Sequence, residues 1–177
     1  MKVLVTGGVR SGKSRHAEGL LDARRDVTYV APGPTTDEDA DPDPDWAERI
    51  AAHRSRRPVS WTTLESRDLA AALTTPGPVL VDCLGTWLTA VLDREQAWER
   101  PGSQVHALVE THLSAAVVEL RRATGPVVLV TNEVGLGVVP AHRSGRLFRD
   151  LLGLTNQQLA AECDEVHLVV AGRVLVL

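Results

Sequence analysis

The stretch that decides the fold is KVLVTGGVRSGKSRHAE, residues 2–18. Its first five residues form a short β-like run, and the residues after the glycine-rich loop carry a helical pattern. The segment GGVRSGKS between them fits the spacing G-x-x-x-x-G-K-[ST]. Glycines let backbone N–H groups approach phosphate oxygens, and the following helix N-terminus is electropositive. The stretch therefore predicts a strand, a phosphate-binding loop and a helix. The alternative is a structural glycine turn.

The loop residues have distinct expected roles. Lys13 should reach the β- and γ-phosphates of a nucleotide, and the Ser14 hydroxyl should bind Mg²⁺. The predicted nucleotide-binding residues of the loop are Gly7, Gly8, Val9, Arg10, Ser11, Gly12, Lys13 and Ser14.

The rest of the chain alternates short apolar runs with helical patterns, which predicts an α/β protein with a mostly parallel sheet and helices on both faces. The 177 residues suggest a single domain, 1–177. Further strands are expected at 27–31, 78–83, 126–131, 165–172 and 173–177, with a shorter edge strand at 59–63. The last two runs are joined by a tight turn and predict a C-terminal β-hairpin. The segment 32–45 is longer than an ordinary loop between a strand and a helix.

Composition narrows the class of protein. Aromatic residues make only 3% of the chain, so we expect a core of Val, Leu and Ala. The net charge of the chain is −4. Residues 37–45 hold six acids and no base, so the acidity lies in this segment and the remainder of the chain is slightly basic. Nothing in this pattern indicates nucleic-acid or membrane binding. The chain shows no signal peptide and no apolar run of membrane-spanning length, and its two cysteines lack metal-site spacing. We expect a cytoplasmic protein.

Polar residues stand at the ends of two predicted strands. Asp82 ends the run 78–83 and could bind Mg²⁺ directly or through water; the alternative is an N-cap of the next helix. Asn132 and Glu133 follow the run 126–131, in a loop that is either functional or structural. Asp82 and Glu133 are also the candidates for the general base of a phosphoryl transfer.

The segment ERIAAHRSRRPVSW, residues 48–61, places His53 among arginines. By itself this is an ordinary basic helix face. Beside a phosphate loop, the arginines gain a use as a second group of phosphate contacts. Nearby cations favour the neutral imidazole, whose nitrogen can attack phosphorus. The segment therefore has the groups for covalent phosphoryl or nucleotidyl transfer, and these residues do not decide between the two.

The combination of motifs resembles the bifunctional adenosylcobinamide kinase/adenosylcobinamide-phosphate guanylyltransferase family of cobalamin biosynthesis. The resemblance runs in order along nearly the whole chain, through VLVTGGVRSGKSRHAE, RIAAHRSRRPVSWTTLE, VLVDCLGTWLT, VVLVTNEVGLGVVP and the tail GRLFRDLLGLTNQQLAAECDEVHLVVAG. It implies phosphorylation of adenosylcobinamide with ATP or GTP, followed by transfer of GMP from GTP to the adenosylcobinamide phosphate. It also implies a RecA-like P-loop fold and a homotrimer.

The same resemblance implies site residues. His53 matches the histidine that carries GMP in the family. The guanine-nucleotide contacts fall, by motif, on Arg15, Ala31, Pro32, Gly33, Arg54, Ser55, Arg56, Arg57, Glu65 and Asp82. Pro32 departs from the Thr usual in the family and has no backbone N–H to donate.

Two other functions fit parts of the sequence. A kinase for another small hydroxylated metabolite would need the phosphate loop but not His53. A nucleotide-dependent switch would need neither a phosphate acceptor nor a covalent intermediate.

Overall fold

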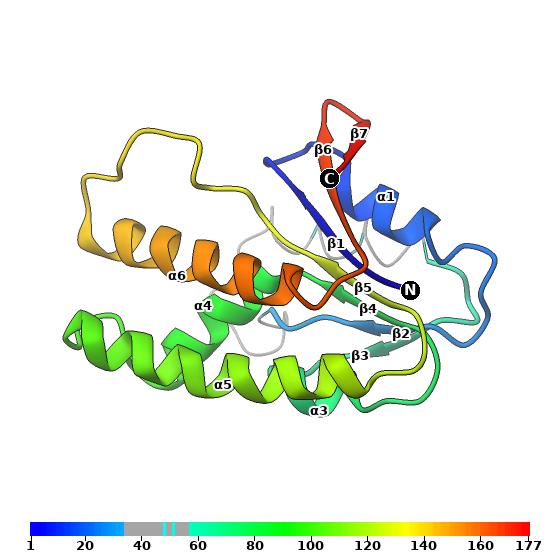
Figure 1. The fold of residues 1–177 in the computed structure, drawn as a ribbon, viewed down its shortest axis with the longest axis horizontal. Coiled ribbons are helices and arrows are strands. Elements are labelled where there is room, and N and C mark those ends of the chain that lie inside the picture. Colours follow the sequence, from blue (N-terminus) through cyan, green and yellow to red (C-terminus); the bar gives the residue numbers. More distant parts are fainter. Residues whose placement is uncertain (34–47, 49–50, 52–56) are drawn as a thin grey trace.

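The computed structural model describes residues 1–33, 48, 51 and 57–177. One seven-stranded sheet has the order β3-β2-β4-β5-β1-β6-β7 (Figure 1). All neighbouring strands pair in parallel except β6 and β7, which form an antiparallel hairpin. The strands are β1 (Lys2–Gly7), β2 (Thr28–Val30), β3 (Thr62–Leu64), β4 (Val79–Asp82), β5 (Val127–Val130), β6 (Glu165–Val170) and β7 (Arg173–Val176). The predicted α/β class, mostly parallel sheet and terminal hairpin are confirmed.

The helices are divided unequally between the two faces of the sheet. Of the helices in the described part of the chain, Figure 1 shows α1 on one face and α3, α4, α5 and α6 on the opposite face. They are α1 (Lys13–Gly19), α3 (Leu69–Leu73), α4 (Leu84–Arg94), α5 (Gly102–Arg122) and α6 (Arg143–Ala160). Among the described residues, no helix has the length and apolar character to cross a membrane.

The central strands are buried on both faces, which explains their continuous apolar runs. In β4, Val79 and Val81 join the core cluster under the four helices, whereas Leu80 joins the cluster under α1. The same alternation runs through β5, since successive side chains of a strand point to opposite faces. Val and Leu thus fill both layers, as the low aromatic content predicts.

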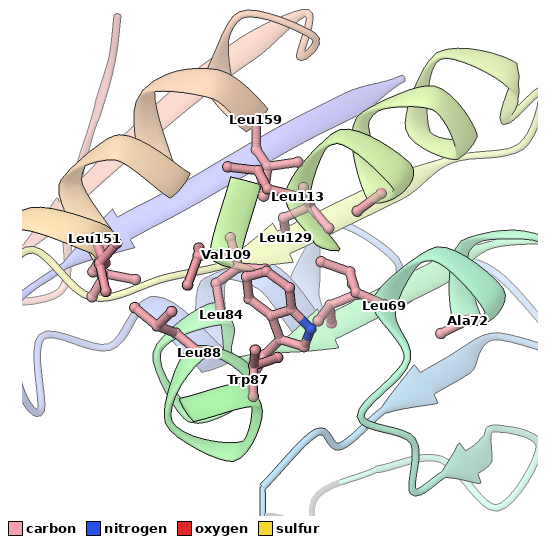
Figure 2. Packing of buried hydrophobic residues seen from close by; sticks show 14 of the residues in the cluster. Leu69, Ala72, Leu84, Trp87, Leu88, Val109, Leu113, Leu129, Leu151 and Leu159 are labelled. Carbon is pink, nitrogen blue, oxygen red and sulfur yellow. The ribbon is translucent and has the colours of Figure 1, made fainter. Parts of the chain in front are cut away.

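Trp87 of α4 lies at the centre of the larger core, among leucines of neighbouring elements (Figure 2). It is 1% exposed and packs in one cluster with Leu84, Leu88 and Val109. Burial of each such side chain contributes on the order of 1.5–3 kcal/mol. This layer fixes β4 and β5, the two strands whose ends carry Asp82 and Asn132.

Two element boundaries differ from the sequence pattern. The helical pattern of residues 14–25 yields a helix that ends at Gly19, followed by turns, because glycine weakens a helix. Leu21 beyond it is still buried against the sheet. By contrast, α6 continues through Gly153 without a break. The predicted edge strand 59–63 is present as β3, displaced to Thr62–Leu64 at one edge of the sheet.

Candidate nucleotide-binding site

The carboxyl ends of the parallel strands bring the predicted polar residues to one edge of the sheet. The pairing places Asp82 of β4 level with Val130 of β5, and Val130 level with Val5 of β1. Since Val30 pairs with Val81, Ala31 follows β2 at the level of Asp82. This edge is where open α/β sheets bind ligands.

The phosphate loop lies at the same edge, between β1 and α1. Gly12 is the N-cap of α1, with a left-handed φ of 97°, and no side chain caps the helix there. Arg10 also has a positive φ, 55°. A Cβ on Gly7 would lie 2.4 Å from the Val169 carbonyl oxygen and 2.8 Å from Ser11 Oγ, so larger residues are excluded. The loop thus has the backbone turn that leaves N–H groups available to phosphate.

The terminal hairpin supports this loop from behind. The Gly172 N–H, in the turn between β6 and β7, donates to the Ser11 carbonyl at 2.9 Å. A Cβ added to Gly12 would lie 3.6 Å from Gly172 Cα, an ordinary van der Waals distance. What favours glycine at both positions is the left-handed backbone, with φ values of 97° and 75°. The predicted hairpin therefore has a structural role that the sequence pattern did not reveal.

Lys13 is buried, at 5% exposure, and its Nζ donates to the Gly8 carbonyl at 3.1 Å. Ser11 Oγ, two positions earlier in the loop, is buried and has no hydrogen-bond partner among the described residues. Phosphate oxygens accept hydrogens from both an ammonium and a hydroxyl group. Both observations fit a loop built to receive phosphate.

Ser14 and Asp82 present the oxygen ligands that Mg²⁺ prefers. They belong to α1 and β4, which are in contact. Both side chains are partly exposed. The N-cap of α4 is Cys83, so the alternative capping role does not fall on Asp82. Two protein oxygens are enough, since Mg²⁺ sites normally add nucleotide phosphates and water. The residues therefore fit the metal.

Asp82 is held from the neighbouring strand. Tyr29 of β2 donates its phenol hydrogen to Asp82 Oδ2 at 3.0 Å. Arg57 lies over the Tyr29 ring, with Cζ 3.6 Å from the ring centroid, and donates to Thr63 Oγ1 at 2.7 Å. Tyr29 thus contacts both Arg57 and Asp82, two residues predicted independently as nucleotide contacts. No sequence pattern marked Tyr29 itself as a site residue.

The other predicted nucleotide contacts are spread along the same edge. The Ala31 N–H already donates to the Leu64 carbonyl at 2.9 Å, so it extends the sheet. Pro32 is buried, Gly33 is partly exposed, and Glu65 is exposed just after β3. Arg15 is exposed on α1. Between Ala31 and Pro32, neither backbone nitrogen offers an unused N–H, which leaves Gly33 for a main-chain contact.

His53, Arg54, Ser55 and Arg56 lie outside the described residues, as does the whole acidic segment 37–45. Arg57 is the described end of this basic segment.

The loop after β5 is held in place by α6. The Glu133 N–H donates to the Gly7 carbonyl at 3.1 Å, which places the loop beside the phosphate loop. Arg149 of α6 donates to the carbonyls of Gly135 and Gly137, at 2.6 and 2.9 Å. Of its apolar residues, Leu136 is 88% exposed and Val138 is 95% exposed. The contact of Arg149 with this loop has no local sequence signal.

A second polar chain was not predicted. His16 of α1 and His167 of β6 are joined by a hydrogen bond between Nε2 and Nδ1 at 2.8 Å. His167 is 5% exposed, and its Nε2 lies 2.7 Å from Glu165 Oε2. An ionised Glu165 accepts a hydrogen from His167 Nε2, so His167 Nδ1 accepts from His16. The chain fastens α1, just behind the phosphate loop, to the sheet.

Acid should weaken this fastening. Burial, and secondarily His167, lowers the pKa of His16 from its ordinary value. Below about pH 6.5 the unfolded state therefore binds more protons than the folded state. The stability that the neutral His16 contributes is fully present above that pH, and it is lost as the pH falls toward the folded-state pKa of His16. We expect the free energy of unfolding, from urea titration, to be lower at pH 5.5 than at pH 7.5, and His16→Gln to reduce the difference.

The matched control is His106→Gln, at an exposed position of α5. This variant should keep the parent difference between the two pH values. If His16→Gln keeps it as well, the acid sensitivity comes from other groups.

A mostly parallel α/β sheet with a phosphate loop at its carboxyl edge defines a P-loop nucleotide-binding protein. Within that class, residues 3–177 match the family described as cobinamide kinase / cobinamide phosphate guanyltransferase. The chain belongs to this family. The resemblance stated from the sequence is confirmed, and with it the assignment to a bifunctional transferase family of cobalamin biosynthesis.

Curated relatives match over nearly their whole length. The bifunctional adenosylcobalamin biosynthesis protein CobU of Salmonella typhimurium is 39% identical, and that of Escherichia coli is 41% identical; each match covers 97% of both chains. CobP of Pseudomonas aeruginosa is 38% identical over 97% of this chain and 94% of that protein. Among solved structures, the P4 protein of bacteriophage φ6 in complex with ADP has a TM-score of 0.42 and 16% identity. That match covers 98% of this chain and about half, 52%, of that chain.

Proposed function

We propose that this protein catalyses two successive transfers on one substrate. It phosphorylates the aminopropanol hydroxyl of adenosylcobinamide with ATP or GTP, and then transfers GMP from GTP to the new phosphate. The products are adenosylcobinamide-GDP and pyrophosphate. The observation that carries the proposal is the phosphate loop, with its buried Lys13, in a chain that matches the family over residues 3–177.

In the kinase step the substrate hydroxyl attacks the γ-phosphorus and the nucleoside diphosphate leaves. Lys13 and the amides of residues 7–14 bind the phosphates and offset the charge that develops on them. Ser14 and Asp82 would hold Mg²⁺, which when bound supplies further positive charge at the phosphates. Glu133 and Asp82 are the carboxylates at this edge that could accept the hydroxyl proton.

In the guanylyl step a neutral His53 nitrogen attacks the α-phosphorus of GTP, and pyrophosphate leaves. An oxygen of adenosylcobinamide phosphate then attacks the same phosphorus, and the P–N bond breaks. Two displacements replace one difficult transfer between two anions. Arg54, Ser55, Arg56 and Arg57 would bind the phosphates in both displacements. The position of Arg57 beside Tyr29 and Asp82 supports a place for this segment at the phosphate-loop edge.

Nucleotide contacts outside the phosphate loop are proposed for Arg15, Gly33 and Glu65. Ala31 and Pro32 would contribute van der Waals contact, since the Ala31 N–H is already paired with Leu64 and proline has none.

We further propose that the chain is a single domain that works in the cytoplasm as a homotrimer. The outer strand β7 supports an oligomer: all four of its residues are exposed, and Val174, Leu175 and Val176 are apolar. An exposed apolar edge strand invites a partner.

Light scattering after gel filtration should therefore give the mass of three chains. Leu175→Asp should shift the protein to a smaller mass, because the interface would have to bury a charge. Val118→Asp, at an exposed position of α5, is the matched control and should leave the mass unchanged. A monomeric parent protein would contradict the trimer.

The function itself is tested with adenosylcobinamide, Mg²⁺ and GTP, followed by chromatography and mass spectrometry. Adenosylcobinamide phosphate should appear first and adenosylcobinamide-GDP second, with one pyrophosphate released per conjugate. A kinase alone would stop at the phosphate. A nucleotide-dependent switch would form GDP without modifying the corrinoid.

A further inference from the structure

Tyr29 is the single tyrosine of the chain, and it lies in the middle of β2. Its side chain is 3% exposed and belongs to the core cluster under α1. Its hydroxyl reaches out of that core to Asp82 Oδ2, at 3.0 Å. Tyr29 is therefore a core residue whose hydroxyl contacts Asp82, the carboxylate proposed for the metal site.

The register of the sheet explains the contact. Tyr29 pairs with Leu80 on β4, and Asp82 is two residues further along that strand. Residues two apart on a strand face the same side, so Leu80 and Asp82 share the α1 face with Tyr29. A diagonal neighbour of this kind is within reach of an aromatic side chain.

The ring of Tyr29 makes the second contact. Arg57 stacks on it with Cζ 3.6 Å from the ring centroid. The Arg57 guanidinium also donates to Thr63 Oγ1 at 2.7 Å, and Thr63 pairs directly with Tyr29 across β2 and β3. Arg57 is therefore held by a ring and a hydroxyl from two adjacent strands.

Packing alone does not require the hydroxyl. A phenylalanine would fill the core and offer the same ring to Arg57, but it would not donate to Asp82. Burial first, and then the charge of Asp82, raises the pKa of Tyr29 well above its ordinary value. The phenol therefore stays protonated and remains a donor throughout the neutral range.

We propose that Tyr29 is a positioning residue for the transfer reactions: its hydroxyl orients the Asp82 carboxylate for the metal-bound nucleotide, and its ring holds Arg57 in the same site. The inference rests on the proposed function, in which Asp82 contributes to Mg²⁺ binding. It adds a physical link between that carboxylate and the segment that begins with His53.

Calorimetric titration with GDP, in Mg²⁺ and in EDTA, tests the inference without relying on activity. Mg²⁺ should strengthen GDP binding by the parent protein. Tyr29→Phe should lose about tenfold of the affinity in Mg²⁺, as expected when the partner of a metal-binding group is removed. Its affinity in EDTA should equal that of the parent.

The matched control is Thr75→Val, which removes a hydroxyl that donates to the Ala72 carbonyl at 2.8 Å, just after α3 and before β4 begins. It should leave both affinities unchanged. In an Asp82→Asn background, Tyr29→Phe should have no further effect, because the two residues act as one unit.

Three results would overturn the inference: no effect of Tyr29→Phe, an equal loss in Mg²⁺ and EDTA, or additive losses in the double variant. If the parent protein binds GDP equally well in Mg²⁺ and in EDTA, the proposed metal site is wrong. The inference about Tyr29 is then wrong as well.

Discussion

Replacement of His53 by asparagine should abolish guanylyl transfer, with a loss of about a thousandfold or more, because the residue is the proposed covalent carrier of GMP. Asparagine has a similar size and keeps a polar side chain, but its amide nitrogen is not a nucleophile. The kinase step should remain measurable, since the γ-phosphoryl group passes directly to the substrate hydroxyl. The variant should therefore accumulate adenosylcobinamide phosphate.

The covalent intermediate gives this prediction a second measurement. Parent protein incubated with GTP labelled at the α-phosphorus should retain label that survives alkali and is released by acid, as a phosphoramidate would. His53→Asn should retain none. The matched control is His142→Asn, because His142 is exposed and makes no side-chain capping bond at the start of α6. Equal labelling of His53→Asn and the parent protein would assign the carrier to another residue.

The features that sequence predicts well are those in which neighbouring residues supply the signal. The phosphate loop from Gly7 to Ser14 is such a case, since its spacing and its strand–helix context are both local. Asp82 is another: an acid that ends a buried strand must lie at the carboxyl edge of a parallel sheet. The class of fold follows from the same logic, because strands buried on both faces have continuous apolar runs.

The features that sequence does not predict are contacts between residues far apart in the chain. Tyr29 and Asp82 are separated by 53 positions, and His16 and His167 by 151. The order of the strands decides these contacts, and no local pattern encodes it. Within its apolar run, Tyr29 has the sequence pattern of a core residue. Only the pairing of β2 with β4 brings its hydroxyl to Asp82. The support of Ser11 by the terminal hairpin has the same origin.

Replacement of Lys13 by methionine should impair both transfers. Lys13 is the only buried one of the two lysines in the chain. Methionine keeps most of the unbranched stem and removes the charge. Loss of one charged group that stabilises the phosphates costs about 10²–10³-fold in rate. The expected result is therefore a drop of that order in kcat/KM for the kinase and the guanylyl steps alike, which separates this variant from His53→Asn.

Stabilisation by bound nucleotide gives this prediction a second measurement. A ligand that binds the folded state raises the unfolding temperature by an amount that depends on its affinity. Because Lys13 is proposed to bind the phosphates, added GTP should raise the thermal unfolding temperature of Lys13→Met less than that of the parent. Lys2→Met is the matched control, because Lys2 donates to the Arg121 carbonyl, away from the phosphate loop, and this variant should keep both activities. If GTP raises the unfolding temperature of Lys13→Met as much as that of the parent, Lys13 does not contribute to phosphate binding.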